Sequence, residues 1–196
     1  MILTIVRHGE TEENIKGITQ GHMHGKLTDR GIEQARKLAL RLREARMDAV
    51  FSSDLGRARE TTREIIRFHK KTPVIFTKEL RERSRGIFDG KPEEELEKAI
   101  EKSGIPKTKF APEGGESFDK LRERARNFLD ALYKEYKGKR VLIVPQGTFT
   151  RIMIAVLLSK PLEEALEMKQ GNACVNVIEV GDNSKKAHLI NCVRHL

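Results

Sequence analysis

Arg7 and His8 stand side by side at a place where a ligand site is expected. They follow the apolar run 2–6, and Gly9 comes directly after them. A short apolar run that breaks into a glycine predicts a buried strand ending in a turn, and in α/β proteins ligands bind at the carboxyl ends of strands. A guanidinium and an imidazole there suit one chemistry, in which the cation holds a phosphoryl group while a neutral ring nitrogen attacks it.

A surface arginine–histidine pair is the alternative explanation of this dipeptide. Gly9 favours a site, because glycine lets the backbone approach a ligand closely and lets a main-chain group fix one imidazole nitrogen. Asn14, Gln20 and Gly21 follow in a glycine-containing loop. The two neutral amides could donate hydrogen bonds to phosphate oxygens, although each of them alone is also an ordinary loop residue.

Two further strand-to-helix transitions carry polar residues. Arg57 lies in the first turn of a predicted helix, directly after a predicted strand, and the N-terminus of a helix favours anions. Gln146 and Gly147 follow another apolar run in the same way. We expect Gln146 to stand near His8 if the strands that precede them are neighbours in the sheet.

Glu82 is the one acid among three arginines, Arg81, Arg83 and Arg85. A salt-bridge network is a sufficient structural explanation of this cluster. In a closed pocket, however, a carboxyl group could protonate a leaving oxygen. The cluster falls in the segment 79–115, which is long, charged and contains glycines. We expect this segment to be an insertion that forms a lid over the strand ends.

The elements that must position these residues alternate between strands and helices. Apolar runs predict strands over 2–6, 49–52, 140–144, 174–180 and 187–193, with 74–76 as a possible sixth. Helical patterns predict helices after a cap at Thr28 or Asp29, over 55–68, from Pro92, over 118–132 and over 148–158. Such alternation implies an α/β fold with a mainly parallel sheet covered on both faces. A chain of 196 residues fits one domain over 1–196.

The composition argues against nucleic-acid and membrane functions. The formal net charge is +9, but basic residues are mixed with acids along the helices, and only 5% of the residues are aromatic. These features favour a solvated charged surface over a nucleic-acid footprint. The sequence contains no run of about 18 or more apolar residues, so we expect no membrane span.

The N-terminal sequence and the two cysteines indicate in which cellular compartment the protein is expected. The sequence opens directly on a predicted strand rather than on a signal-peptide pattern, so we expect a cytoplasmic protein. Cys174 and Cys192, the only cysteines, fall in predicted strands and are expected to be reduced thiols rather than a disulfide or metal ligands. The sequence predicts no particular oligomeric state.

Taken in order, these segments resemble the histidine phosphatase superfamily, which includes the cofactor-dependent phosphoglycerate mutases. The resemblance extends from residue 2 to residue 180. Its two strongest pieces are 7–11 with Asn14, and 52–55 with Arg57 and Ala58. The supporting pieces are Leu27, Thr28, Gly31, Gln34 and 114–117.

The resemblance implies roles for the matching residues. His8 would be the nucleophile that becomes phosphohistidine. Arg7 and Arg57 would hold the transferring phosphoryl group, and Asn14 would donate to it as well. Two guanidiniums can neutralise phosphoryl charge without Mg²⁺, and a covalent intermediate divides one difficult displacement into two easier ones.

The same resemblance implies further roles, the fold and the cofactor requirement. Glu82 matches the family's acid, which protonates the leaving oxygen and then helps to activate water. Gln20 and Gly21 would touch the substrate. The implied fold is a three-layer α/β/α sandwich with a mainly parallel central sheet, like that of the phosphoglycerate mutases. No metal and no other cofactor is implied.

Gln146 departs from the family pattern, because the family has a second histidine there, immediately before the glycine that matches Gly147. Glutamine offers a neutral amide in nearly the same place. By analogy with the loss of one pre-organised contact, the chemical step would slow roughly 10²- to 10³-fold. The alternatives are a slower natural phosphatase, a phosphate binder that has lost turnover, and a residue introduced to trap a complex. Pro145 is also unusual, which favours a natural variant.

The expected function is therefore that of a phosphomonoester phosphatase, acting on a small sugar phosphate or a similar metabolite. The segments 80–91 and 112–117 look most like phosphatases of the fructose-2,6-bisphosphatase type, and Arg81, Arg83 and Arg85 are expected as spare cations near the mouth of the site. A catalytically weak or inactive regulatory protein that binds a phosphate ester or inorganic phosphate is the alternative. A phosphoglycerate mutase is less favoured, because the true mutases have longer insertions.

Overall fold

A six-stranded sheet runs through the computed structural model, which describes all residues from 1 to 196. The strands lie in the order β3-β2-β4-β1-β5-β6. The first four in this order are parallel to one another, whereas β5 and β6 are antiparallel to their neighbours. The strands are β1 (Ile2–Val6), β2 (Ala49–Ser53), β3 (Val74–Thr77), β4 (Arg140–Val144), β5 (Val175–Val180) and β6 (Lys185–Cys192).

These strands confirm the mainly parallel sheet that the sequence predicts. The possible strand at 74–76 is real and forms the parallel edge of the sheet as β3. Each of the other strands lies within two residues of its predicted bounds. The condition under which Gln146 is expected near His8 is met, because β1 and β4 pair directly, with Ile2 opposite Arg140.

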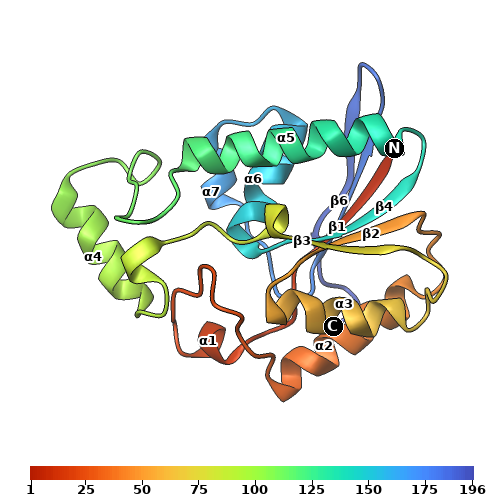
Figure 1. Cartoon of the computed structure of the whole chain (residues 1–196), viewed down its shortest axis with the longest axis horizontal. Coiled ribbons are helices and arrows are strands. Elements are labelled where there is room, and N and C mark those ends of the chain that lie inside the picture. Colours follow the sequence, from red (N-terminus) through yellow and green to blue (C-terminus); the bar gives the residue numbers. More distant parts are fainter.

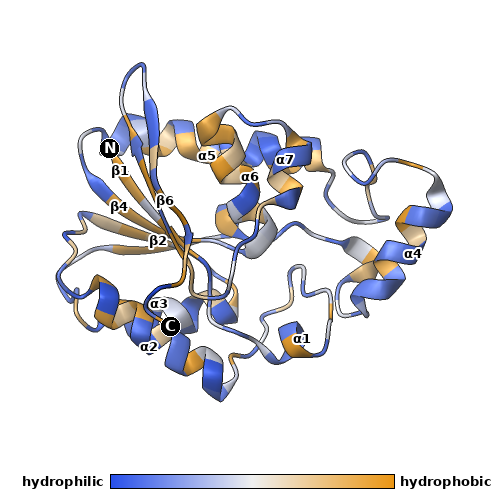
Figure 2. Cartoon of the chain, turned by 180° about the vertical axis from the view of Figure 1, so that it is seen from behind, coloured by the Kyte–Doolittle hydropathy of each residue, from blue (hydrophilic) through white to orange (hydrophobic).

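Helices cover both faces of the sheet, which confirms the three-layer arrangement (Figure 1). On one face lie α2 (Asp29–Leu42) and α3 (Gly56–Ile66), and on the other lie α5 (Phe118–Tyr136), α6 (Gly147–Leu158) and α7 (Leu162–Glu167). Successive residues of a strand point to opposite faces. In β4, Val141 and Ile143 accordingly pack with α5 and α6, whereas Leu142 and Val144 pack with α2 and α3. Figure 2 shows the hydrophobic residues concentrated in the strands between these layers.

Local signals explain where the main helices begin. Thr28 caps α2, and its hydroxyl oxygen accepts a hydrogen bond from the backbone N–H of Gly31 at 2.9 Å. Ser117 caps α5 in the same way, through the N–H of Lys120. Pro92 stands one residue before α4 (Glu93–Ser103) rather than inside its first turn. Two short helices, α1 (Glu12–Ile15) and α7, lack the length for a visible apolar period and were not predicted.

The segment 79–115 lies beyond the carboxyl ends of the parallel strands. It contains α4 and the short 3₁₀ turn η2 (Gly86–Phe88), and it begins within another such turn, η1 (Lys78–Leu80). Figure 1 shows α4 standing away from the sheet, on the same side as α1. The stretch between η1 and η2 carries Glu82. No helix in the structure has the length and apolar character needed to cross a membrane.

Candidate active site

The carboxyl ends of three parallel strands gather the predicted residues around one cavity of about 650 Å³. His8 follows β1, Gln146 follows the adjacent β4, and Arg57 begins the helix after β2, on the other side of β4. Gln146 lies just behind the wall, bonded to Arg57. The other predicted residues line the cavity, namely Arg7, His8, Asn14, Gln20, Gly21, Arg57, Glu82 and Gly147.

The imidazole of His8 is held in its neutral form. His8 is 2% exposed, and its Nδ1 lies 2.7 Å from the carbonyl oxygen of Gly9. Since a carbonyl can only accept, Nδ1 carries the proton and Nε2 keeps its lone pair. Burial, followed by the charges of Arg7 and Arg57, holds the pKa of His8 well below its ordinary value. The ring is therefore uncharged at neutral pH.

Gly9 serves this histidine in a different way from the one predicted. A Cβ at Gly9 would lie 2.2 Å from the carbonyl oxygen of Gly31 in α2. The close approach that requires glycine is therefore to a neighbouring helix and not to a ligand. The prediction that a main-chain group fixes the imidazole is confirmed, and the group is the carbonyl of Gly9 itself.

Arg57 is almost completely buried and has no carboxylate partner at salt-bridge distance. It is 1% exposed, and its guanidinium donates to Oε1 of Gln146 at 2.7 Å and to the carbonyls of Met23, His24 and Gly21. Burial lowers the pKa of Arg57 to about 10, so it stays charged at neutral pH. Four of its five N–H groups are used, which leaves one donor and a positive charge without a salt-bridge partner for an anion.

Arg7 brings a second guanidinium to the same cavity. Its Nη1 donates to the carbonyl of Gln170 at 2.5 Å, whereas its Nε is buried without a partner. Burial is the main cause that lowers the pKa of Arg7. Gly147 allows this placement, because a Cβ there would lie 3.2 Å from Nε of Arg7. The sequence predicted Gly147 at the site, and the structure shows how it makes room for the cation.

Gln146 is oriented by Arg57. Its Oε1 accepts the Arg57 bond, and the opposite end of the amide, Nε2, is buried without a hydrogen-bond partner. Buried polar atoms are nearly always paired, so an unpaired donor needs an explanation. Nε2 of Gln146 and Nε of Arg7 are thus two buried donors without acceptors. Arg7 lines the cavity, whereas Gln146, predicted as a substrate-binding residue, lies behind Arg57 and does not line it.

The loop residues contribute further polar groups. Oδ1 of Asn14 accepts bonds from the N–H of Thr11 and from Nδ2 of Asn172. This leaves the Asn14 amide nitrogen free to donate into the cavity. Oε1 of Gln20 is buried without a partner, and the carbonyl of Gly21 holds Arg57 at 3.1 Å. Gly21 therefore supports the site partly through its backbone.

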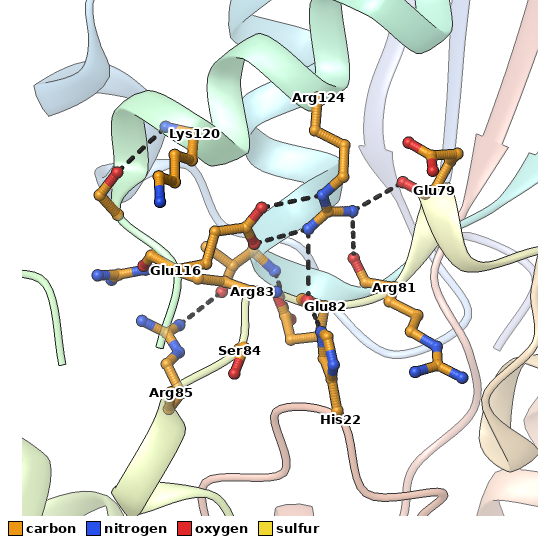
Figure 3. A network of polar contacts seen from close by, with 12 residues as sticks. His22, Glu79, Arg81, Glu82, Arg83, Ser84, Arg85, Glu116, Lys120 and Arg124 are labelled. Atoms are coloured by element: carbon orange, nitrogen blue, oxygen red, sulfur yellow. Dashed lines mark hydrogen bonds and ion pairs between the residues drawn. The ribbon is translucent and has the colours of Figure 1, made fainter. Parts of the chain in front are cut away.

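Glu82 is fixed at both carboxylate oxygens (Figure 3 shows its surroundings). Oε1 accepts from the N–H of Arg83 at 2.7 Å, and Oε2 accepts from the N–H of Thr148 at 2.9 Å. Burial alone would raise the pKa of Glu82. The Arg85 charge, these two N–H groups and the Arg57 charge outweigh burial and lower the pKa below its ordinary value. Glu82 is thus ionised at neutral pH when no anion is bound.

The three arginines around Glu82 are not equivalent, and two of them are not the spare cations that the sequence predicted. Arg81 makes a bidentate pair with Asp54, at 2.7 and 2.6 Å. The guanidinium of Arg83 donates to the carbonyls of Glu116 and Phe110 and lies 3.7 Å from the Phe118 ring centroid. Both are occupied by structural contacts. Arg85 alone lines the cavity without a carboxylate or carbonyl partner; it donates to the Thr148 hydroxyl at 3.0 Å.

Several contributors were missed by sequence reasoning. Asn172 donates to Asn14 and to the carbonyl of His8, and Gln170 supplies the carbonyl that holds Arg7. They lie just before β5, the antiparallel neighbour of β1. The signal available was the polar run at 169–172 before a predicted strand. His22 and His24 bond to the backbone of Glu82 and Gly56 and do not line the cavity, so neither replaces a catalytic histidine.

A model of the "Histidine phosphatase superfamily (branch 1)" matches residues 3–193. The chain belongs to this superfamily. A solved structure of the alpha-ribazole phosphatase from Shigella flexneri superposes with a TM-score of 0.88 at 30% identity, covering 98% of this chain and 96% of that one. This histidine phosphatase thus has the fold that its residues predicted.

Two curated relatives are similar in sequence. The "Metal-independent phosphoserine phosphatase" of Arabidopsis thaliana is 35% identical over 92% of this chain and 76% of the relative. The "Fructose-2,6-bisphosphatase TIGAR" of Bos taurus is 37% identical over 66% of this chain and 50% of the relative. The prediction of a phosphoric monoester hydrolase is confirmed at the level of enzyme class. The three names differ in substrate, so they do not assign one to this histidine phosphatase.

Proposed function

We propose that this chain hydrolyses phosphate monoesters through a phosphohistidine on Nε2 of His8. The observation that carries the proposal is the environment of that nitrogen. A buried neutral imidazole has its lone pair on Nε2, and two guanidiniums, Arg7 and Arg57, line the same cavity without carboxylate partners. Oriented donors that await negative charge stabilise a phosphoryl group in transfer.

The first step transfers the phosphoryl group to the enzyme. Nε2 of His8 attacks phosphorus while the bond between phosphorus and the ester oxygen breaks. The leaving oxygen takes a proton from the Glu82 carboxyl group and departs as an alcohol. Arg7 and Arg57 neutralise the charge on the three peripheral oxygens, and Gln146 orients Arg57 from behind.

The second step returns the enzyme to its starting state. Glu82, now a carboxylate, takes a proton from water, whose oxygen attacks phosphorus while the bond to Nε2 of His8 breaks. Inorganic phosphate leaves, His8 regains its lone pair, and Glu82 regains the proton that it gave away.

The ionised state of Glu82 in the free protein fits this cycle. Its pKa is lowered in part by Arg85 and Arg57. A bound phosphate dianion offsets these positive charges and also repels a nearby carboxylate, so binding favours protonation of Glu82. A substrate that binds as the monoanion can also transfer its own proton to the Glu82 carboxylate, which leaves Glu82 protonated in the same way.

The residues at the outer part of the cavity indicate which kind of substrate fits it. Two helices face it with the same pattern, Glu-x-x-Leu-Glu: one is α4 and the other is α7. On α4 the pattern places Glu93, Leu96 and Glu97 at the cavity, and Ile100 follows one turn later. On α7 it places Glu163, Leu166 and Glu167 there.

The charge on these walls disfavours a second phosphate. Glu97 is paired with Lys107 at 2.6 Å, whereas Glu93, Glu163 and Glu167 line the cavity without a salt bridge. The cavity is therefore cationic at the His8 end and acidic with apolar strips at its mouth. We propose a substrate with one phosphoryl group and an uncharged or cationic organic part. A sugar monophosphate satisfies this description, but a bisphosphate or a mutase substrate with a second anionic group does not.

Detection of the covalent intermediate tests the reaction. The protein is mixed with a phosphate monoester, quenched and analysed for phosphate on His8 that is labile in acid and stable in base. We expect this intermediate, together with steady phosphate release, in the wild type and neither in His8→Asn. Intact phosphate binding without any release would instead favour the second candidate, a phosphate-binding regulatory protein. The neutral Gln146 at the family's histidine position is the observation that supports that candidate.

A panel of esters tests the substrate class. We expect kcat/KM to be higher for monophosphates with neutral or amine-bearing groups than for bisphosphates of similar size. Glu163→Lys and Glu167→Lys should shift this ratio toward bisphosphates by roughly five- to tenfold each. Glu164→Lys is the matched control, since Glu164 is on the same helix but pairs with Lys160 outside the cavity. A bisphosphate preference in the wild type would contradict the assignment without affecting the proposed chemistry.

A further inference from the structure

Arg124 lies outside the cavity but holds the chain segment that carries Glu82. Its guanidinium donates to the carbonyls of Glu79 at 2.7 Å, Arg81 at 3.0 Å and Glu82 at 3.5 Å (Figure 3). The stretch between η1 and η2 belongs to no helix or strand. Two of its backbone carbonyls are held by a side chain from elsewhere in the fold, because Arg124 on α5 donates to those of Arg81 and Glu82. Arg124 also donates to the carbonyl of Glu79 in η1.

Glu116 completes this arrangement. Its carboxylate holds the same guanidinium in two bonds, from Nε at 3.0 Å and from Nη2 at 2.8 Å. Its backbone joins the segment independently, because its N–H donates to the carbonyl of Ser84 and its own carbonyl accepts from Arg83. The side chains of Arg124 and Glu116 are each 17% exposed, so their pair is largely shielded from water.

The position of Arg124 is also tied to α6. The guanidinium carbon of Arg124 lies 4.3 Å from the centroid of the Phe149 ring. Phe149 follows Thr148, whose N–H donates to Oε2 of Glu82. One arginine thus contacts both the backbone behind Glu82 and the helix that orients the Glu82 carboxylate.

We propose that Arg124 and Glu116 are positioning residues that fix the Glu82 carboxyl group against the leaving oxygen. The inference rests on the proposed function, because it assumes that Glu82 is the proton donor. A general acid must come within hydrogen-bond distance of the atom that it protonates, and a misplacement of about 1 Å can lower the rate on the order of 10²-fold. Arg124 and Glu116 do not line the cavity, so they act on this one step without touching the substrate.

The test uses the dependence of the rate on the leaving group. An alkoxide needs a proton in order to leave, whereas p-nitrophenolate does not. In Arg124→Gln we expect kcat for an alkyl phosphate to fall roughly 10- to 100-fold, with KM unchanged and kcat for p-nitrophenyl phosphate within about threefold of the wild type. Arg124→Lys, which keeps the charge but not the planar fork, should recover only part of the loss.

Arg126→Gln is the matched control, because Arg126 is exposed on the same helix. It should leave both substrates unchanged. An equal loss on the alkyl and nitrophenyl substrates would show a general structural role and overturn the proposal, and so would the absence of any loss. If Arg124→Gln does not fold, Glu116→Gln provides the same comparison, since it removes one of the two oxygens that accept from Arg124 and also the negative charge.

A double-mutant cycle separates this proposal from the proposed function. In a Glu82→Gln background, Arg124→Gln should cause no further loss with the alkyl substrate, because the group that it positions is already gone. Losses that multiply would overturn the positioning role while leaving the phosphohistidine chemistry intact. A wild type that forms no phosphohistidine and releases no phosphate would instead refute the proposed function.

Discussion

The Nε–H of Arg57 donates to Oε1 of Gln146 at 2.7 Å, and both residues are buried. This bond determines which end of the glutamine amide stays free, so Nε2 is the atom left without an acceptor. The position where the resemblance expects a histidine therefore offers a hydrogen-bond donor but no positive charge. The donor is oriented by the same arginine that is proposed to hold the phosphoryl group.

Gln146→His should increase the rate of turnover. A histidine at this position can carry positive charge against the phosphoryl oxygens, so we expect kcat to rise roughly 10²- to 10³-fold. Gln146→Leu should lower it by a factor on the order of 10², because Arg57 loses the acceptor that orients its guanidinium. Saturating kinetics with one phosphate ester measure both. Equal rates in all three proteins would show that position 146 does not face the reaction.

Inorganic phosphate should stabilise the protein through Arg57. The buried charge of Arg57 has no carboxylate partner, and a bound anion compensates it. At a phosphate concentration of 100 times Kd we expect about 2.7 kcal/mol of added stability, or a rise in Tm of roughly 5 to 10 °C. Thermal unfolding with and without phosphate measures the effect, which Arg57→Leu should abolish.

Arg59→Leu is the control for this experiment. Arg59 is on the same helix, but its guanidinium lies 4.4 Å from the Phe76 ring centroid, and its Nε donates to the carbonyl of Asp54. Its loss should leave the phosphate-dependent rise in Tm unchanged. A rise that persists in Arg57→Leu but not in Arg59→Leu would place the anion site elsewhere.

His8 should make stability fall in acid. Its folded-state pKa lies well below its ordinary value because it is buried and faces two arginines. Below about pH 6.5 the unfolded chain therefore binds a proton that the folded protein excludes. The wild type should lose stability relative to His8→Asn by about 1.4 kcal/mol per pH unit as the pH falls below 6.5, and the difference should be constant above pH 7.5. Urea unfolding at several pH values measures this, and parallel curves throughout would contradict it.

Gly147→Ala should impair the site without unfolding the protein. The added Cβ would lie 3.2 Å from Nε of Arg7, the side chain of which can shift by a few tenths of an ångström. We expect phosphate affinity to fall roughly tenfold and stability to change by less than about 1 kcal/mol. Gly9→Ala should instead act mainly on stability. We expect it to destabilise the folded protein by about 1 to 3 kcal/mol, because its Cβ would meet the backbone of Gly31 at 2.2 Å. Titration calorimetry and urea unfolding distinguish the two effects.

Local patterns predicted where His8, Arg57 and Gln146 would meet. Each follows an apolar run that breaks into a turn or a helix, and parallel strands end at a common edge. The difference among Arg81, Arg83 and Arg85 could not be predicted in this way. Their contacts come from residues distant in sequence, such as Asp54 for Arg81 and the carbonyls of Phe110 and Glu116 for Arg83. Periodicity describes one element at a time, whereas these contacts depend on how separate segments pack.

The sheet order has a consequence for how the molecule is made. β1 lies between β4 and β5, with Ile2 opposite Arg140 on one side and Glu179 on the other, and Arg7 is held by the carbonyl of Gln170. During translation the strand that precedes His8 therefore leaves the ribosome long before either of its partner strands exists. A nascent chain that has not reached Gln170 lacks the carbonyl that holds Arg7, so we expect phosphate to stabilise only chains that extend beyond this residue.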